Sequence, residues 1–385
     1  MDLSPAFTPR AHATNASDFT YNPFKLANTA WTGASKKAAK VAEEALLSKW
    51  VKSPYTLGKV SIDLPQLGLG VQKINTLDVN SDADGVPLVL THGAGSGIAF
   101  FYKNIEALAT LNGGRRRLLA FDWLGCALSS RPSYPYGGIG AKPTWLLTEE
   151  ERVTAAIRFS VESLEAWRIA MRLERFDLAA HSMGGYLATQ YALAHPERVR
   201  RLVLISPVGW ARRPEGELAD ARAKGLFGAL WESGLGNFGF AKILGRIVQG
   251  VAQSAVLGRL NIRDEEERKL VASYFWNSLC GQPVSAERNI NYLLVPYLPP
   301  APFGFYARRP VCTEPPERLA KLPPTTLLYG SNDLHYIPTM PEAVKAVAAV
   351  SREPVRMDFV RRADHHLYID NPEDFHAKVA RAIDA

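Results

Sequence analysis

Short apolar runs alternate with helical stretches over most of the chain, and this alternation constrains the fold more than any other feature. The runs at residues 88–91, 176–180 and 325–329 have the length of buried strands, and a segment of helical character follows each of them. This order is typical of a mostly parallel sheet that helices cover on both faces. The sequence therefore predicts an α/β protein.

Further elements follow from spacing and capping. Val153, Ile157 and Val161 recur at helical spacing and predict a helix over residues 148–172. Asn371 before Pro372 predicts the start of a last helix. The other expected elements are helices at 35–51 and 184–194, two short strands between residues 55 and 79, and strands at 118–122, 202–206 and 355–360.

The alternation stops between residues 208 and 321, where the sequence is rich in helix-forming and aromatic residues. An insertion at this point, after the sixth strand, would lie over the C-terminal edge of the sheet, where such folds bind ligands. We therefore expect a helical lid at 208–321 between two parts of one core, at 35–207 and 322–385. A flexible segment is expected at 1–34.

The charge balance favours a lipid surface as partner. The formal net charge is +7, and a basic protein attracts anionic partners. The densest basic clusters, at 115–117 and 198–201, stand just before predicted strands, where solvated turns explain them. No zinc-ligand spacing or long basic block in the sequence indicates nucleic acid. Three cysteines form no disulfide framework and suit a reducing compartment. We expect a cytoplasmic protein, peripheral on membranes or lipid droplets.

The N-terminal region supports more than one interpretation. It lacks a basic stretch followed by an apolar core, which argues against a secretory signal and leaves an organelle transit peptide open. Trp31 and Trp50 flank the helix expected at 35–51. The two indoles either insert into a lipid interface or belong to a helix packed on the domain edge, and the sequence favours neither.

A nucleophile motif follows the strand at 176–180. Ala180 and Gly184 stand two residues before and after Ser182. Small residues at these positions let the strand and the following helix approach each other around a strained serine, as in the pattern Gly-x-Ser-x-Gly. Ala180 departs from that pattern but remains small. We predict that Ser182 is a nucleophile.

A serine hydroxyl needs a base, and the sequence offers one with an acid behind it. Asp333 lies just past a predicted strand end, and His365 follows the last predicted strand. The order serine, acid, histidine fits the nucleophile motif. We predict that His365 takes the Ser182 proton while Asp333 fixes the tautomer of the imidazole. His366 is the alternative base; the spacing of His365 to the last helix favours His365, and we assign His366 to the site wall.

The oxyanion of an acyl-transfer intermediate needs hydrogen-bond donors. The turn at 91–95, with the sequence Thr-His-Gly-Ala-Gly, follows a buried strand. We predict that the backbone N–H groups of Ala94 and Met183 form the oxyanion hole, where one lost donor typically costs about 3–4 kcal/mol. We expect structural roles for the side chains of His92 and Asp122.

Taken together, these motifs resemble one subfamily of the α/β-hydrolase fold. It comprises lysophosphatidic acid acyltransferases, N-acylphospholipid lipases and the lipid-droplet co-activator of triglyceride lipase. The likeness runs from about residue 42 to the C-terminus and is strongest to the soluble plant-type members. Its signatures include the Ser182 motif and the segments at 52–55, 129–132, 162–168, 307–310, 329–333 and 365–372. Ala127, Ala180 and Leu334 depart from the subfamily pattern.

The resemblance implies three functions. The first is serine-dependent hydrolysis of phospholipid or lysophospholipid esters through an acyl-serine intermediate. The second is acyl transfer to lysophosphatidic acid, with acyl-CoA as co-substrate. The third is a non-catalytic lipid-droplet co-activator, although the presence of Ser182 favours an enzyme. We expect no metal or redox cofactor. Arg308 and Arg309 border the predicted lid and either bind an anionic headgroup or form a solvated loop pair.

Overall fold

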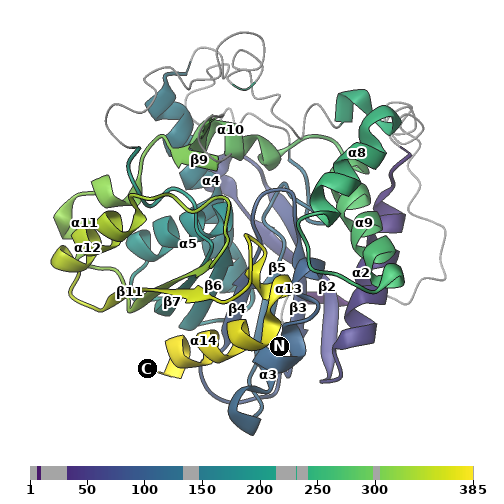
Figure 1. Ribbon diagram of the computed structural model, residues 1–385, viewed down its shortest axis with the longest axis horizontal. Coiled ribbons are helices and arrows are strands. Elements are labelled where there is room, and N and C mark those ends of the chain that lie inside the picture. Colours follow the sequence, from purple (N-terminus) through teal and green to yellow (C-terminus); the bar gives the residue numbers. More distant parts are fainter. Residues whose placement is uncertain are drawn as a thin grey trace.

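The protein is built around one twisted sheet (Figure 1), seen here in a computed structural model. Its nine strands lie in the order β1-β2-β3-β5-β4-β6-β7-β10-β11. The pairs β1–β2, β2–β3 and β3–β5 are antiparallel, and the remaining five pairs are parallel. The predicted α/β class is therefore confirmed. The structure describes residues 7–9, 33–132, 147–213, 231, 242–297 and 304–384.

The strands fall close to the positions that the sequence predicts. Both strands predicted between residues 55 and 79 are present, and each has nine residues, longer than the short strands expected. The strand predicted at 202–206 begins earlier, at Val199. The strands are β1 (Phe7–Pro9), β2 (Tyr55–Asp63), β3 (Val71–Val79), β4 (Leu88–Thr91), β5 (Leu118–Phe121), β6 (Phe176–His181), β7 (Val199–Ile205), β10 (Thr325–Gly330) and β11 (Val355–Val360).

Two apolar layers cover the sheet because successive strand residues point to opposite faces. Val89 of β4 belongs to one layer, whereas its neighbours Leu88 and Leu90 belong to the other. The first layer is completed by α4 (Glu149–Ala170), α5 (Met183–Ala194), α11 (Pro316–Leu319) and α12 (Met340–Val350). The second is completed by α2 (Lys36–Trp50), α3 (Ile105–Ala109), α13 (Leu367–Asp370) and α14 (Pro372–Asp384).

The helix ends follow the capping residues of the sequence. Ser35 Oγ accepts the N–H of Ala38 at 3.0 Å at the start of α2. Asn371 Oδ1 accepts the N–H of Asp374 at 3.3 Å at the start of α14, as its position before Pro372 predicts. These caps fix where the helices begin relative to the strands that they cover.

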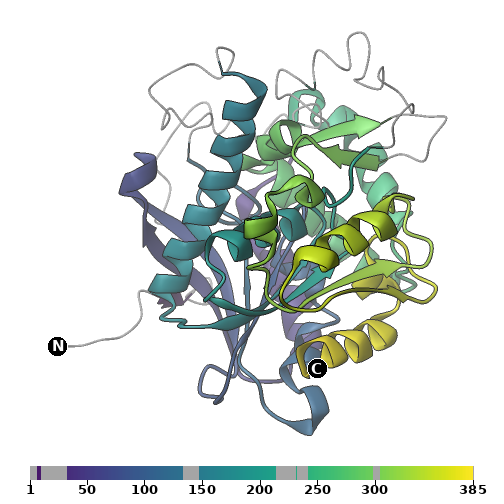
Figure 2. The ribbon, with the colours of Figure 1, turned by 90° about the vertical axis from the view of Figure 1, so that its left-hand side faces the viewer.

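The insertion between β7 and β10 lies at one end of the sheet, at the top in Figures 1 and 2. Its described part contains α8 (Arg246–Leu257), α9 (Glu265–Cys280) and α10 (Asn289–Leu293). It also contains an antiparallel hairpin of β8 (Leu294–Tyr297) and β9 (Gly304–Ala307). The insertion is therefore helix-rich, as expected, and it also contains a short hairpin that the sequence did not predict. Four-residue strands, one with Pro296, are too short to show a period of two.

The N-terminal region corrects one expectation and decides between two others. Residues Phe7–Pro9 form β1 on the edge of β2, so the segment 1–34 is not wholly irregular. The Trp50 ring packs edge-on against Tyr102, with 5.6 Å between centroids. This contact supports a packed helix and contradicts insertion of Trp50 into lipid, whereas Trp31 lies outside the described residues. In the described segments, no helix combines the length and apolarity needed to span a bilayer.

Candidate active site

Ser182 stands at a sharp turn between β6 and α5. Its backbone has φ 55° and ψ −122°, a left-handed conformation that costs a non-glycine residue energy. Tight packing holds the turn: a Cβ on Gly184 would lie 2.3 Å from the carbonyl oxygen of His92, and a Cβ on Gly93 would lie 2.7 Å from Ser182 Cβ. Glycine is therefore required at both positions, and Ser182 is pushed out at the end of the sheet.

The structure brings the three predicted catalytic side chains together. His365 Nε2 lies 3.0 Å from Ser182 Oγ, and His365 Nδ1 lies 3.3 Å from Asp333 Oδ1. The three residues follow β6, β10 and β11, whose C-terminal ends share one edge of the sheet. The Asp333 side chain is fully buried and that of His365 is 11% exposed, so both lie beneath the half-buried Ser182. The arrangement has the geometry of a nucleophile, a base and an acid that orients the base.

His366, the alternative base, lies beside this chain of contacts. Its ring is 5.5 Å from that of His365 and 5.8 Å from that of Phe100. Burial lowers the pKa of His366 to about 4, so this imidazole is neutral at pH 7. These contacts are those expected of a residue that lines the site, as predicted for His366.

The electrostatics favour a neutral imidazole next to Ser182. Burial lowers the pKa of His365 well below its ordinary value, and the neighbouring His335 and His366 add to the effect. Burial raises the pKa of Asp333, while hydrogen bonds from its surroundings oppose that rise. A neutral His365 can accept the Ser182 proton at Nε2 when Nδ1 carries its hydrogen toward Asp333.

Two residues that the sequence analysis overlooked surround Asp333. The backbone N–H of His335 donates to Asp333 Oδ1 at 2.8 Å, and the His335 ring lies 4.3 Å from that of His365. Ser206, buried just after β7 with φ 44°, faces the same carboxylate and lowers its pKa. Within the described residues neither the Ser206 hydroxyl nor Asp333 Oδ2 has a partner in ordinary hydrogen-bond geometry, so we interpret this contact as a loose one. The only signal in the sequence is that Ser206 follows the strand next to the acid-bearing strand.

The loops that carry the acid and the base are joined to each other. A Cβ on Gly330 would lie 2.4 Å from the carbonyl oxygens of both Ala363 and Asp364. Across this contact the N–H of Asn332 donates to Ala363 O at 2.9 Å, and the N–H of Leu334 donates to Asp364 Oδ1 at 2.9 Å. The position of the imidazole is therefore set by the loop of the acid as well as by its own strand.

The turn predicted to supply an oxyanion donor lies against the serine. Its two close approaches, from Gly93 to Ser182 and from Gly184 to His92, bring the turn against the start of α5, and the roles of the Ala94 and Met183 N–H groups stay a prediction. His92 accepts the N–H of Trp123 at Nε2 at 3.1 Å, and its carbonyl oxygen accepts the indole N–H at 2.9 Å. His92 is thus held in a structural network.

Asp122 has the bonding of a structural residue. Its carboxylate accepts the N–H of Ile98 at 2.8 Å, the N–H of Leu128 at 3.0 Å and the side-chain amide of Asn75 at 2.9 Å. Asp122 therefore joins the segment after the turn at 91–95, which we call the oxyanion turn, to the loop after β5. This is the structural role expected for Asp122.

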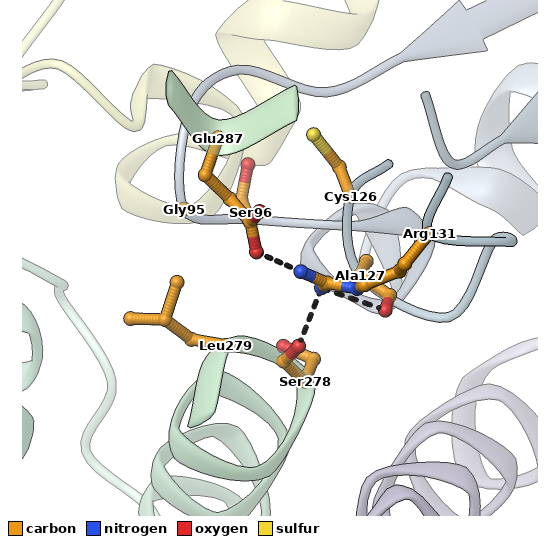
Figure 3. A pocket seen from close by; sticks show the side chains of 8 residues that line it. All are labelled: Gly95, Ser96, Cys126, Ala127, Arg131, Ser278, Leu279 and Glu287. Atoms are coloured by element: carbon orange, nitrogen blue, oxygen red, sulfur yellow. Dashed lines mark hydrogen bonds and ion pairs between the residues drawn. The ribbon is translucent and has the colours of Figure 1, made fainter. Parts of the chain in front are cut away.

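A small pocket lies between this turn and the insertion (Figure 3). Gly95 and Ser96 line it from the turn, and Ser278 and Glu287 line it from the insertion. Arg131 closes it by pairing with Glu287 and donating to Ser278 O at 3.0 Å. The insertion is thus attached directly beside the oxyanion turn. Within the described ranges, no group of three metal-binding side chains occurs.

Arg308 and Arg309 already have acidic partners. Arg308 pairs with Glu149 and Arg309 with Glu150, both in the first turn of α4. Arg309 also donates to Thr154 Oγ1 at 2.7 Å. The pairs join the end of β9 to α4, so a headgroup would have to compete with two carboxylates, and headgroup binding here stays a prediction.

Comparisons with known proteins place the chain in a family. The family model described as the alpha/beta hydrolase fold matches residues 86–372, so the chain belongs to the alpha/beta hydrolase fold family. Solved structures agree on the fold: a bacterial membrane phospholipase A superposes with a TM-score of 0.55 at 18% identity, over 93% of this chain and 94% of its own.

Curated relatives narrow the comparison to proteins of lipid metabolism, and the predicted resemblance is confirmed. A 1-acylglycerol-3-phosphate O-acyltransferase of Arabidopsis thaliana is 31% identical over 91% of this chain and 81% of its own. A (lyso)-N-acylphosphatidylethanolamine lipase of Homo sapiens is 31% identical over 81% of this chain and 84% of its own. The 1-acylglycerol-3-phosphate O-acyltransferase ABHD5 of Sus scrofa is 30% identical over 90% and 89%.

Proposed function

We propose that the protein is a serine-dependent hydrolase of phospholipid or lysophospholipid esters. The observation that carries the proposal is the 3.0 Å contact between Ser182 Oγ and His365 Nε2, backed by the buried Asp333. Relatives named as a lipase and as acyltransferases of glycerolipids support an acyl-lipid substrate.

The proposed reaction has two halves. Ser182 Oγ attacks the ester carbonyl carbon while His365 Nε2 takes the hydroxyl proton, and Asp333 stabilises the imidazolium that forms. The N–H groups of Ala94 and Met183 donate to the oxyanion. The C–O bond to the alcohol then breaks, and the alcohol leaves with the proton from His365. The acyl group remains on Ser182.

The second half decides between hydrolysis and transfer. Water, deprotonated by His365, attacks the acyl-serine and releases a fatty acid, which makes the protein a hydrolase. If the hydroxyl of lysophosphatidic acid attacks instead, after acylation of Ser182 by acyl-CoA, phosphatidic acid forms. The curated relatives named as 1-acylglycerol-3-phosphate O-acyltransferases favour this second candidate. No cofactor is needed in either route.

The test follows the fate of a labelled acyl group. The full-length protein is incubated with acyl-labelled phospholipid and lysophospholipid, and separately with labelled acyl-CoA and lysophosphatidic acid. We expect label in free fatty acid in the first reaction. Label in phosphatidic acid in the second reaction, with little free fatty acid in the first, would replace the hydrolase by the acyltransferase.

Ser182→Ala is the matched control. It should abolish both product formation and labelling by a fluorophosphonate probe, which reacts only with an activated serine. A wild-type protein that forms neither product and is not labelled would contradict both enzymatic functions and favour a non-catalytic co-activator. Product formation that survives in Ser182→Ala would show that the proposed nucleophile is wrong.

A further inference from the structure

Helix α8 of the insertion has a broad apolar face, but only part of this face is packed. Val248, Ala252 and Val256 rest on the apolar layer beneath α8. Beside this packed stripe, Ile247 and Val251 are each 72% exposed, and Leu244 just before the helix is 38% exposed. Exposed apolar residues that extend a packed apolar face are typical of a surface that contacts a partner or a membrane.

A further apolar surface lies on the neighbouring helices. α8 packs on α9, where Gln253 Nε2 donates to Ala272 O at 3.1 Å, and α9 packs on α2 (Figure 1). A groove with mostly apolar walls runs between α2 and α9. Its walls include Ala38, Val41 and Leu270, and Val41 is itself 56% exposed. We call α8, this groove and the outer face of α2 the α8–α2 surface.

The charges of the α8–α2 surface are distributed unevenly. Residues 243–260 contain Arg246 and Arg259 but no acidic residue. A Cβ on Gly33 would lie 2.6 Å from Arg246 Nε, so the start of α8 lies next to the start of α2, where Lys37 and Lys40 stand.

The acidic first turn of α9 lies at the other end of the surface. There Asp264, at its N-cap, pairs with Lys49 at the end of α2. The end of α9, with Ser278, lies at the basic end of the surface and also lines the pocket beside the oxyanion turn. The basic, apolar end of the surface is therefore the end nearest the active site.

We infer that the α8–α2 surface docks the protein on an anionic phospholipid bilayer. Ile247, Val251 and Val41 would enter the headgroup boundary, while Lys37, Lys40 and Arg246 would meet lipid phosphates. Charge complementarity selects an anionic lipid surface over a second copy of this chain, which would bring the same cations face to face. Docking there would place a lipid source beside the proposed acyl-ester site, although the surface itself does not depend on catalysis.

Vesicle flotation of the full-length chain tests the inference. We expect wild type to float with vesicles of phosphatidylcholine and phosphatidylglycerol and much less with phosphatidylcholine alone. Replacing two exposed aliphatic side chains by carboxylates in Ile247→Asp/Val251→Asp should weaken partitioning by about tenfold or more. Lys37→Glu/Lys40→Glu should remove most of the preference for anionic vesicles, at about 1 kcal/mol per charge, or roughly fivefold each.

The controls keep the test decisive. Ile169→Asp makes the same change at a 58% exposed position on α4, outside the surface, and should float as wild type does. Ile247→Asn is the milder variant if the double variant unfolds. Ser182→Ala should float normally, so failure of docking and failure of catalysis are separable.

Three results would overturn the inference. In the first, wild type does not float. In the second, flotation is unchanged in both surface variants. In the third, wild type sediments as a dimer that Ile247→Asp/Val251→Asp dissociates while flotation stays the same, which would assign the surface to a second copy.

Discussion

The core and the insertion are held in different ways. Side chains of the core strands interlock in two apolar layers, and most of them are completely buried. The described part of the insertion also packs on these layers, through residues such as Tyr274, Trp276 and Ile290, and in addition it joins the core through charges. Glu287 pairs with the buried Arg131 of the core and with Lys242, and the pairs of Arg308 and Arg309 with α4 add two more joints.

This difference indicates which parts of the protein should tolerate substitution. Apolar burial tolerates a volume-conserving change of one side chain because many neighbours share the contact. A buried ion pair does not, because removing one charge leaves the other without compensation in a low-dielectric interior. Ser182, Asp333 and His365 follow strands that apolar burial holds in place, whereas the insertion depends on buried ion pairs as well as on apolar contacts.

The largest expected effect concerns the core alone. Asp333→Asn should lower kcat/KM for a short-chain ester by about 10⁴-fold, because the amide would no longer orient and stabilise the His365 imidazolium. The unfolding free energy should change little, because the residue stays buried in the same place. Asp364→Asn, in the adjoining loop, is the control and should retain most of the activity. Equal losses in the two variants would mean that Asp333 has only a structural role.

The next effect tests the joint between core and insertion. Arg131→Met should lower the unfolding free energy by about 3–5 kcal/mol, because Glu287 would lose its closest cation. Burial raises the pKa of Glu287 but its two cations outweigh that effect and hold the value at about 2, so the carboxylate is charged at neutral pH. Urea unfolding measures the loss, and adding Glu287→Gln should recover part of it. A wild-type value for Arg131→Met would show that the joint is not what holds the insertion.

The pH dependence of activity tests the burial of the base. Since burial lowers the pKa of His365, the neutral imidazole persists at pH values where an exposed histidine is already charged. Activity should therefore fall only below about pH 6.5, by about tenfold per unit beneath the pKa. A kcat/KM profile with a short-chain ester between pH 4.5 and 8 checks this. An inflection above pH 7 would contradict a buried neutral base.

The smallest expected effect concerns the contact between Ser206 and the carboxylate of Asp333. Ser206→Ala should reduce kcat by less than about tenfold, because a loose contact contributes less than a full hydrogen bond to a charged group, which is worth about 1.5–3 kcal/mol. Because the hydroxyl lowers the pKa of Asp333, its loss should raise that pKa. The acid limb of the pH–rate profile should then shift to higher pH. Ser206→Thr is expected to restore the limb if the hydroxyl is responsible. A loss of stability without any shift would give Ser206 a packing role only.

The contrast between core and insertion also explains what the sequence could predict. Local sequence determines strands such as β4 and β10, which are short apolar runs. It also determines the turn at Ser182, which has small residues at fixed spacing. The order of Ser182, Asp333 and His365 after three strand ends was enough to predict that they meet.

The remaining features depend on contacts between distant residues. Ser206 lies near Asp333 only because β7 pairs with β10. Arg131 pairs with Glu287, which is 156 residues away along the chain. The β8–β9 hairpin is short and contains a proline, so its sequence shows no alternation of apolar and polar residues that would predict strands. Arg308 and Arg309 invite a ligand role in the sequence because Glu149 and Glu150 lie so far away along the chain.

Gly330 has a consequence for how the site tolerates change. Because its hydrogen faces two carbonyl groups of the histidine-bearing loop, even an alanine there would force that loop away from the sheet. The imidazole would then be carried away from a serine and an aspartate that are both chemically intact. Inactive variants of this protein should thus include some in which every reactive atom is present and only the alignment among them is lost.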